Sequence, residues 1–143
     1  MPKNWMNAPS RSTRLLLGAL LAALLLLRRP GSLLRPQFWA EDGTLFFQEA
    51  FNHGFWPTIL QPASGYLHSF PRLVAGLSLL FPMERAPLVF NLAAFVVQLM
   101  PALYLLSPRM ARIIPSFPAQ VAAALMYVAL PASYETHVNL TNS

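Results

Sequence analysis

The sequence predicts an all-α, polytopic membrane protein with about three transmembrane helices and an amphipathic interfacial helix in the first outward loop. Hydrophobic residues make up 55% of the 143 positions, charged residues make up 10%, and the mean hydropathy is +0.45. Soluble domains usually carry about 25% charged residues. Because the chain has too few charges to cover a surface in water, a lipid bilayer is the expected solvent for most of one membrane domain, residues 1–143.

Composition also excludes several functions. The net charge of +5 could indicate nucleic-acid binding, but the ten Lys and Arg residues are scattered and form no patch that could follow phosphates, so no nucleic-acid partner is predicted. The chain has no cysteine, which excludes disulfides and cysteine metal sites. Its histidines, His53, His68 and His137, are far apart, so no structural metal site is predicted.

The first apolar run is Leu15 to Leu27, bounded by Arg14 and by Arg28-Arg29. Thirteen helical residues cover roughly 20 Å, less than a hydrocarbon core of about 30 Å. A signal peptide is one interpretation, since basic residues precede the run. Arg28-Arg29-Pro30 stands where a small-residue cleavage site would be needed, so a first transmembrane helix over 15–29, extended by snorkelling arginines, is favoured.

Two further runs predict further spans. Residues 86–107 are uncharged and long enough to cross a bilayer, with Pro101 tolerated as a kink. Residues 119–132 form the third predicted span, whose alanines favour close helix packing. A shorter apolar helix over 73–81 is isolated by prolines, and the sequence leaves open whether it is re-entrant, interfacial or the leading half of the second span.

The distribution of Lys and Arg predicts the orientation of the spans. Positive residues favour the cytoplasmic side, which assigns the tail 1–14 and the loop 108–118 to the cytoplasm. The loop 30–85 and the tail 133–143 then face outward. The tail carries no stop signal of its own, so we expect the chain to be a fragment of a longer protein of the cytoplasmic membrane.

An amphipathic helix is predicted over 42–53 in the outward loop. Thr44, Gln48 and Asn52 recur at helical spacing on one face, and phenylalanines recur on another. Trp39 and Trp56 flank it, which favours a helix lying in the membrane interface over an ordinary core helix.

The acidic pair Glu41-Asp42 stands at the start of this helix and is the predicted catalytic site. Only five residues of the chain are acidic, and two of them are adjacent here. One interpretation is a general base or a ligand of a divalent cation that holds a lipid phosphate. The other is a helix cap that offsets the helix dipole, worth about 1 kcal/mol.

Three residues of the following turn and helix, Tyr66, His68 and Arg72, are the predicted substrate contacts. They supply hydrogen-bonding and cationic groups in the same loop as the acids. Arg72 could hold a phosphate or pair with Glu41 or Asp42, or it could anchor in headgroups.

The segment Phe38-Trp39-Ala40-Glu41-Asp42-Gly43-Thr44-Leu45-Phe46-Phe47, with Gly65-Tyr66-Leu67-His68, Pro71-Arg72 and Asn139-Leu140-Thr141-Asn142, resembles the N-terminal part of GT-C-type glycosyltransferases. The resemblance implies a polytopic enzyme that uses a polyprenyl-phosphate-linked sugar. It implies that Asp42 is the base and Glu41 its neighbour or metal ligand. The family usually has Asp-Glu or Asp-Asp followed by Tyr, whereas this chain has Glu-Asp followed by Phe46.

The sequence therefore predicts a glycosyltransferase fragment that transfers a sugar from a lipid-phosphate carrier on the outer face of the cytoplasmic membrane. Membrane lipids and the sugar donor are the expected partners, and the cofactor is undefined apart from a candidate divalent cation. The alternative is a small non-enzymatic membrane protein that docks a partner or lipid through the loop helix.

Overall fold

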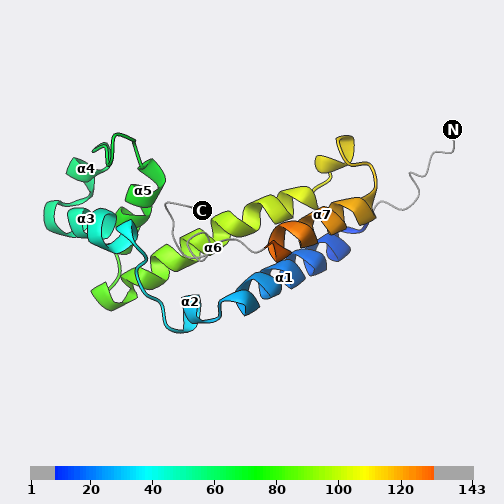
Figure 1. Cartoon of the computed structure of the whole chain (residues 1–143), viewed down its shortest axis with the longest axis horizontal. Coiled ribbons are helices and arrows are strands. Elements are labelled where there is room, and N and C mark those ends of the chain that lie inside the picture. Colours follow the sequence, from blue (N-terminus) through cyan, green and yellow to red (C-terminus); the bar gives the residue numbers. More distant parts are fainter. Residues whose placement is uncertain (1–8, 131–143) are drawn as a thin grey trace. The chain divides into compact units, whose positions relative to one another are not determined.

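The computed structural model describes residues 9–130, and the regular secondary structure in that range is helical apart from one isolated bridge between Ala63 and Tyr66. The predicted all-α class is confirmed. Figure 1 shows the helices in chain order, which are α1 (Arg11–Arg28), α2 (Gly31–Leu34), the π-helix η2 (Asp42–Phe47), α3 (Gln48–His53), α4 (Phe55–Thr58), α5 (Ser69–Ser78), the 3-10 helix η3 (Met83–Arg85), α6 (Ala86–Leu105), the 3-10 helix η4 (Met110–Arg112) and α7 (Phe117–Ala129).

The described chain divides into two compact units. One unit, here called the terminal unit, comprises residues 9–28 and 98–130. The other, here called the loop unit, comprises Arg29–Val97. The first part of α6 belongs to the loop unit and its last part to the terminal unit, and each unit is described by itself below.

In the terminal unit, α1 packs against α7 (Figure 1). An arginine near each end of α1 donates to a carbonyl at the end of another helix: Arg14 Nη1 donates to the oxygen of Leu106, and Arg28 Nη1 donates to the oxygen of Val128. The last carbonyls of a helix have no partner inside the helix, and they carry the negative end of its dipole. The two arginines therefore satisfy helix ends within this unit.

The outer surface of the terminal unit is rich in large apolar side chains. Leu16 is 73% exposed, Leu27 is 74% exposed and Ile113 is 74% exposed. Leu15, Leu20, Met126 and Leu130 are also exposed. Where such side chains adjoin one another, they are typical of contact with a membrane or another protein.

Among the described residues, only Met83–Leu105 is long and apolar enough to cross a membrane. Of its most apolar 18 residues, 28% are buried inside the structure, so most of this apolar helix is open to its surroundings. The helix runs through Pro101, as expected. The first and third predicted spans correspond to α1, which has 18 residues and three arginines, and to α7, which has 13 residues.

Two of the helices begin earlier than predicted. The first helix begins at Arg11 rather than at residue 15. The last begins at Phe117, because Ser116 Oγ caps it by accepting from the Ala119 amide and Pro118 is tolerated in the first turn. Residues 131–132 and the predicted outward tail 133–143 lie outside the described residues, as does most of the predicted tail 1–14.

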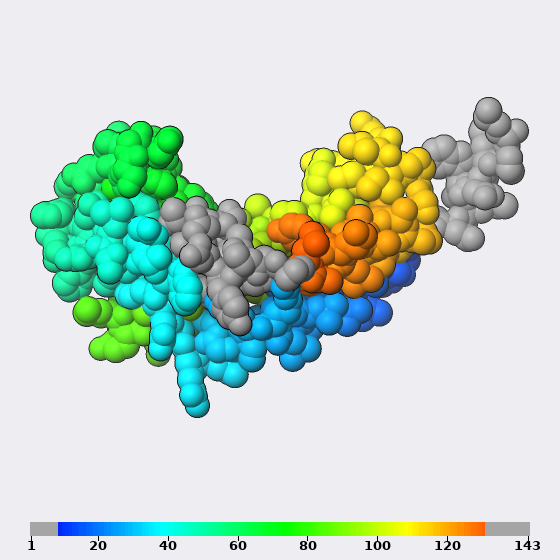
Figure 2. Space-filling view, viewed as in Figure 1, coloured from blue at the N-terminus to red at the C-terminus, as the bar shows by residue number. Residues whose placement is uncertain are grey.

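The loop unit has an aromatic core. Phe46, Phe47 and Phe90 are buried, together with Val74 and five alanines, and Phe38 packs on them. The ring centroid of Phe38 lies 4.8 Å from that of Phe47 and 5.5 Å from that of Phe90. Helices η2, α3, α4 and α5 contact one another, and Figure 2 shows their cyan and green atoms grouped together.

The predicted loop helix over 42–53 is confirmed in extent, as η2 followed directly by α3. Its polar residues Thr44, Gln48 and Asn52 are exposed, as expected. Gly54, with φ of +84°, ends it, since glycine adopts positive φ without a steric penalty. The predicted helix over 73–81 is α5, which ends at Ser78 and is separated from α6 by a turn and η3, so it is not the leading half of that helix.

Candidate functional site

The two acids of the pair lie in different environments. Glu41 is exposed, whereas the side chain of Asp42 is fully buried at 0% exposure. Glu41 occupies the position before η2 with a helical backbone and makes no side-chain capping hydrogen bond, so of the two acids considered as caps Glu41 does not act as one through its side chain. Asp42 is the first residue of η2, and its amide donates to the Trp39 carbonyl at 3.0 Å.

The backbone around the pair is unusual in two respects. Ala40 has a φ of +42°, which an L-residue other than glycine rarely adopts. The next helical segment, Asp42–Phe47, is a π-helix. Left-handed non-glycine residues and π-helical turns both concentrate at functional sites, where the surrounding structure compensates for their cost.

Gly43 allows this backbone to approach the aromatic core. A Cβ atom at Gly43 would lie 2.6 Å from Phe38 Cβ and 2.8 Å from Phe38 Cγ. Atoms at these distances overlap, so only glycine fits directly behind the acids. The sequence Ala40-Glu41-Asp42-Gly43 therefore forms one locally constrained turn that enters the core.

Arg72 lies in the interior of the loop unit. Its side chain is 1% exposed, and its Nη1 donates to Glu49 Oε2 at 2.7 Å. Its guanidinium carbon lies 5.5 Å from the ring centroid of Phe46. The ion pair thus joins α5 to α3 across the π-helical turn that Asp42 begins.

Two nitrogens of Arg72, Nε and Nη2, are buried and have no hydrogen-bond partner among the described residues. Such donors cost free energy unless an acceptor reaches them. Arg72 is therefore held by Glu49 and Phe46 and keeps donor capacity for another acceptor.

The other two predicted substrate contacts lie near this pair in sequence but differ in exposure. His68 precedes α5 and is half-buried, with its ring centroid 5.3 Å from that of Phe46. Tyr66 is 72% exposed, and it closes a tight turn by exchanging two backbone hydrogen bonds with Ala63. Ser64 and Gly65 at the centre of this turn have positive φ, as hairpin turns require, so the predicted turn is confirmed.

Phe46 lies against two of the predicted site residues, Arg72 and His68. It follows Asp42 by about one π-helical turn, and it contacts both Arg72 and His68. Glu49 was not anticipated as a site residue. The sequence could have indicated Glu49, because it is the only acid besides Asp42 in the loop helix and lies one helical turn after Leu45, on the partly apolar side of that helix.

Among residues 9–130, no group of three or more histidine, aspartate or glutamate side chains could hold a metal ion. A divalent cation at the acidic pair would therefore need oxygen ligands from a bound phosphate, as Mg²⁺ often has in phosphate-transferring sites. Comparison with protein-family models, with curated proteins and with solved structures finds no match for this chain.

Proposed function

We propose that this chain is the N-terminal part of a membrane glycosyltransferase that transfers a sugar from a polyprenyl-phosphate carrier, with Asp42 as the general base. The observation that carries the proposal is the fully buried carboxylate of Asp42 at the first residue of a π-helix, two residues after left-handed Ala40. Burying a carboxylate is costly, and so is the local backbone. Their coincidence at three consecutive residues favours a functional site over a helix cap.

The chemical step follows from the carboxylate. Asp42 accepts the proton of the acceptor hydroxyl, the acceptor oxygen forms a bond to the anomeric carbon of the sugar, and the bond from that carbon to the phosphate oxygen breaks. The lipid phosphate leaves with the bonding electron pair. A positioned general base contributes about 10²- to 10⁴-fold to such a rate.

The remaining residues have supporting roles in this proposal. The Arg72–Glu49 pair holds Phe46 and the turn in place, and Nε and Nη2 of Arg72, which have no partner among the described residues, donate to the acceptor or to the leaving phosphate. Tyr66 and His68 contact the sugar from the exposed side. Glu41, which is exposed beside Asp42, binds the divalent cation if one bridges to the phosphate.

The proposal also includes the cytoplasmic membrane as the location. The support is the apolar helix Met83–Leu105 together with the exposed leucines on α1 and α7. Helices α1 and α7 also lie in the bilayer in this proposal, and α1 has an arginine near each end, as a helix that lies in lipid between two polar surfaces often does. The loop unit then faces the outer aqueous phase, where lipid-linked sugars can be used.

The test is Asp42→Asn in membranes that carry the full protein, with transfer of labelled sugar from a polyprenyl-phosphate-linked hexose as the readout. We expect transfer to fall by about 10²-fold or more, because the amide cannot accept the proton. Glu84→Gln, an exposed acid in η3, is the matched control and keeps normal transfer. Unchanged transfer by Asp42→Asn at normal protein levels would refute the proposal.

One observation favours a second candidate, which is lipid docking without catalysis. The loop unit exposes large apolar side chains, with Trp56 81% exposed, Leu60 74% and Phe51 56%. These residues would insert at the membrane interface. Under this alternative, Trp56→Ala weakens binding of the protein to lipid, whereas Asp42→Asn leaves lipid binding unchanged.

A further inference from the structure

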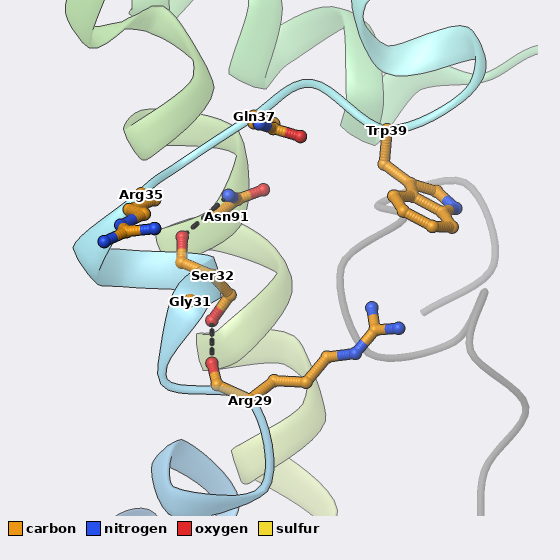
Figure 3. A pocket seen from close by; sticks show the side chains of 7 residues that line it. All are labelled: Arg29, Gly31, Ser32, Arg35, Gln37, Trp39 and Asn91. Atoms are coloured by element: carbon orange, nitrogen blue, oxygen red, sulfur yellow. Dashed lines mark hydrogen bonds between the residues drawn. The ribbon is translucent and has the colours of Figure 1, made fainter.

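A pocket in the loop unit, separate from the acidic pair, is lined by residues that were not expected to form a site. Figure 3 shows its side chains, and its volume is about 300 Å³, the lower end of the range of small-molecule pockets. Arg29, Ser32, Arg35, Gln37 and Trp39 come from the segment between α1 and η2, and Asn91 comes from α6.

The charge of this pocket is positive. Arg29 and Arg35 both line it, and none of the lining residues that the structure describes is acidic. Arg29 has its guanidinium carbon 5.5 Å from the ring centroid of Trp39, so its cation is held beside an aromatic surface. A guanidinium fork matches the oxygens of a phosphate and donates charge-assisted hydrogen bonds to them.

Asn91 gives the pocket a second recognition element. Its side chain is 4% exposed, and its Nδ2 donates to the Ser32 carbonyl at 2.8 Å. That bond fixes the carboxamide so that Oδ1 points away from Ser32, toward the side of Gln37 and Trp39 in Figure 3. Oδ1 is buried and has no hydrogen-bond partner among the described residues.

A buried carbonyl oxygen without a partner requires a donor, and a bare phosphate diester has none. A hydroxyl group on the ligand supplies that donor, while its carbon chain rests on the Trp39 ring. We infer that this pocket binds an organophosphate headgroup whose phosphate is followed by hydroxyl groups, with Arg29 and Arg35 on the phosphate and Asn91 Oδ1 accepting from a hydroxyl.

The experiment uses the full chain in detergent micelles, with Trp5→Phe and Trp56→Phe introduced so that Trp39 is the single tryptophan, excited at a wavelength that tyrosine does not absorb. Glycerol 3-phosphate and methyl phosphate are titrated while Trp39 emission is recorded. We expect both to bind saturably at pH 8, where both phosphates have lost their P–OH proton, and glycerol 3-phosphate to bind more tightly, because only its hydroxyl groups can then donate to Asn91 Oδ1. Absence of saturable binding by either, or equal affinity for both, would overturn the inference.

Three variants assign the binding to named residues. Arg35→Gln, at an exposed position, should lower the affinity for both phosphate compounds by about tenfold, which is the loss expected for one charge-assisted hydrogen bond. Arg85→Gln, which removes the same charge from exposed η3, is the matched control and should leave both affinities unchanged. Asn91→Ala should abolish the preference for glycerol 3-phosphate over methyl phosphate. An equal loss in Arg35→Gln and Arg85→Gln would contradict the assignment, even if Asn91→Ala does not fold.

A second arm identifies the source of the headgroup. Nanodiscs of phosphatidylglycerol are compared with nanodiscs of phosphatidylcholine, whose headgroup has no hydroxyl. A Trp39 response that is specific to phosphatidylglycerol and lost in Arg35→Gln assigns the pocket to a membrane lipid. Binding of free glycerol 3-phosphate without that response assigns it to a soluble organophosphate, and both results support the proposed recognition chemistry.

Discussion

The two units of this chain use their few charged groups in different ways. In the terminal unit, Arg14 and Arg28 donate to carbonyls at the ends of α6 and α7, and large apolar side chains face outward. In the loop unit, Arg72 is buried with Glu49, and a fully buried carboxylate begins a π-helix. The first arrangement satisfies helix ends in apolar surroundings, whereas the second places charge inside an aromatic core.

Under the proposed function, this difference separates the helices that support the site from the unit that contains it. A helix whose polar groups are satisfied and whose surface is apolar can lie in a bilayer, where each unsatisfied backbone group costs several kcal/mol. The loop unit instead contains features that stabilise nothing by themselves, such as the φ of +42° at Ala40 and the orphaned nitrogens of Arg72. Such features are retained where a site needs them.

The largest effect is expected from removing Glu49. Glu49→Ala leaves the Arg72 guanidinium buried without its partner, which typically costs 3–5 kcal/mol. Since the Glu49 side chain is 29% exposed, we expect about 3 kcal/mol, measured as the shift in unfolding free energy in detergent. Glu84→Ala, at an exposed acid, is the control.

The double variant Glu49→Leu with Arg72→Met sharpens this test. Replacing a buried ion pair by apolar residues of similar size is often neutral, so the double variant should recover most of the lost stability. Equal destabilisation by Glu49→Ala and Glu84→Ala would mean that the buried pair does not organise the loop unit.

Substitution of one glycine in each unit compares how tightly the two units are packed. A Cβ atom at Gly76 in α5 would lie 2.2 Å from Cδ2 of the Phe55 ring, so Gly76→Ala should cost about 2 kcal/mol, as overpacking does. A Cβ atom at Gly18 in α1 would lie 2.9 Å from Leu103 Cδ2, the end of a flexible and 43% exposed side chain. The better helix propensity of alanine should offset that contact, so Gly18→Ala should be near neutral.

Thermal unfolding of both variants, followed by circular dichroism, measures this difference. If Gly18→Ala proves as harmful as Gly76→Ala, the terminal unit is packed as tightly as the loop unit. The contrast between the two units would then be wrong in that respect.

The arginine contacts of the terminal unit predict a smaller effect. Arg28→Gln removes the charged donor from the Val128 carbonyl and should cost about 1.5 kcal/mol, the value for a hydrogen bond to a charged group. Arg11→Gln, at an exposed position of the same helix, should change stability by less than about 0.5 kcal/mol. Unfolding midpoints of the two variants give the comparison directly.

Sequence periodicity was sufficient to predict the extent of the loop helix. The spacing of Thr44, Gln48 and Asn52 indicates one face of a helix, and Gly54 indicates where the helix ends. Periodicity could not distinguish a π-helix from an α-helix, since the two differ by one residue in hydrogen-bond register. The Arg72–Glu49 pair joins residues 23 positions apart, and only the tertiary fold chooses among the acids of the loop.

The site outside the acidic pair was missed for a related reason. Arg29 was interpreted as a charge that bounds the first apolar run, Arg35 was given no role, and Asn91 lies inside an apolar run. Only folding brings Asn91 beside Ser32, where its oxygen is left without a partner. A single asparagine within a predicted span was the available signal, since polar residues in such segments often have a functional role.

The smallest effect is expected at Glu41. This exposed residue makes no side-chain capping hydrogen bond, so Glu41→Gln should change the free energy of unfolding by less than about 0.5 kcal/mol. A loss near 1 kcal/mol would indicate that it stabilises the helix start after all. Chemical denaturation of the variant beside the unmodified chain measures the difference.

The central claim is that the loop unit faces the outer aqueous phase while α1 lies in lipid, and thiol labelling tests it most directly. The chain has no cysteine, so Thr44→Cys and Leu20→Cys each introduce a single thiol at an exposed position of one unit. A membrane-impermeant maleimide added to intact cells should label Thr44→Cys and leave Leu20→Cys unlabelled, because a thiol in hydrocarbon does not ionise. Labelling of Leu20→Cys as fast as Thr44→Cys, or of Thr44→Cys only after the cells are opened, would contradict the account.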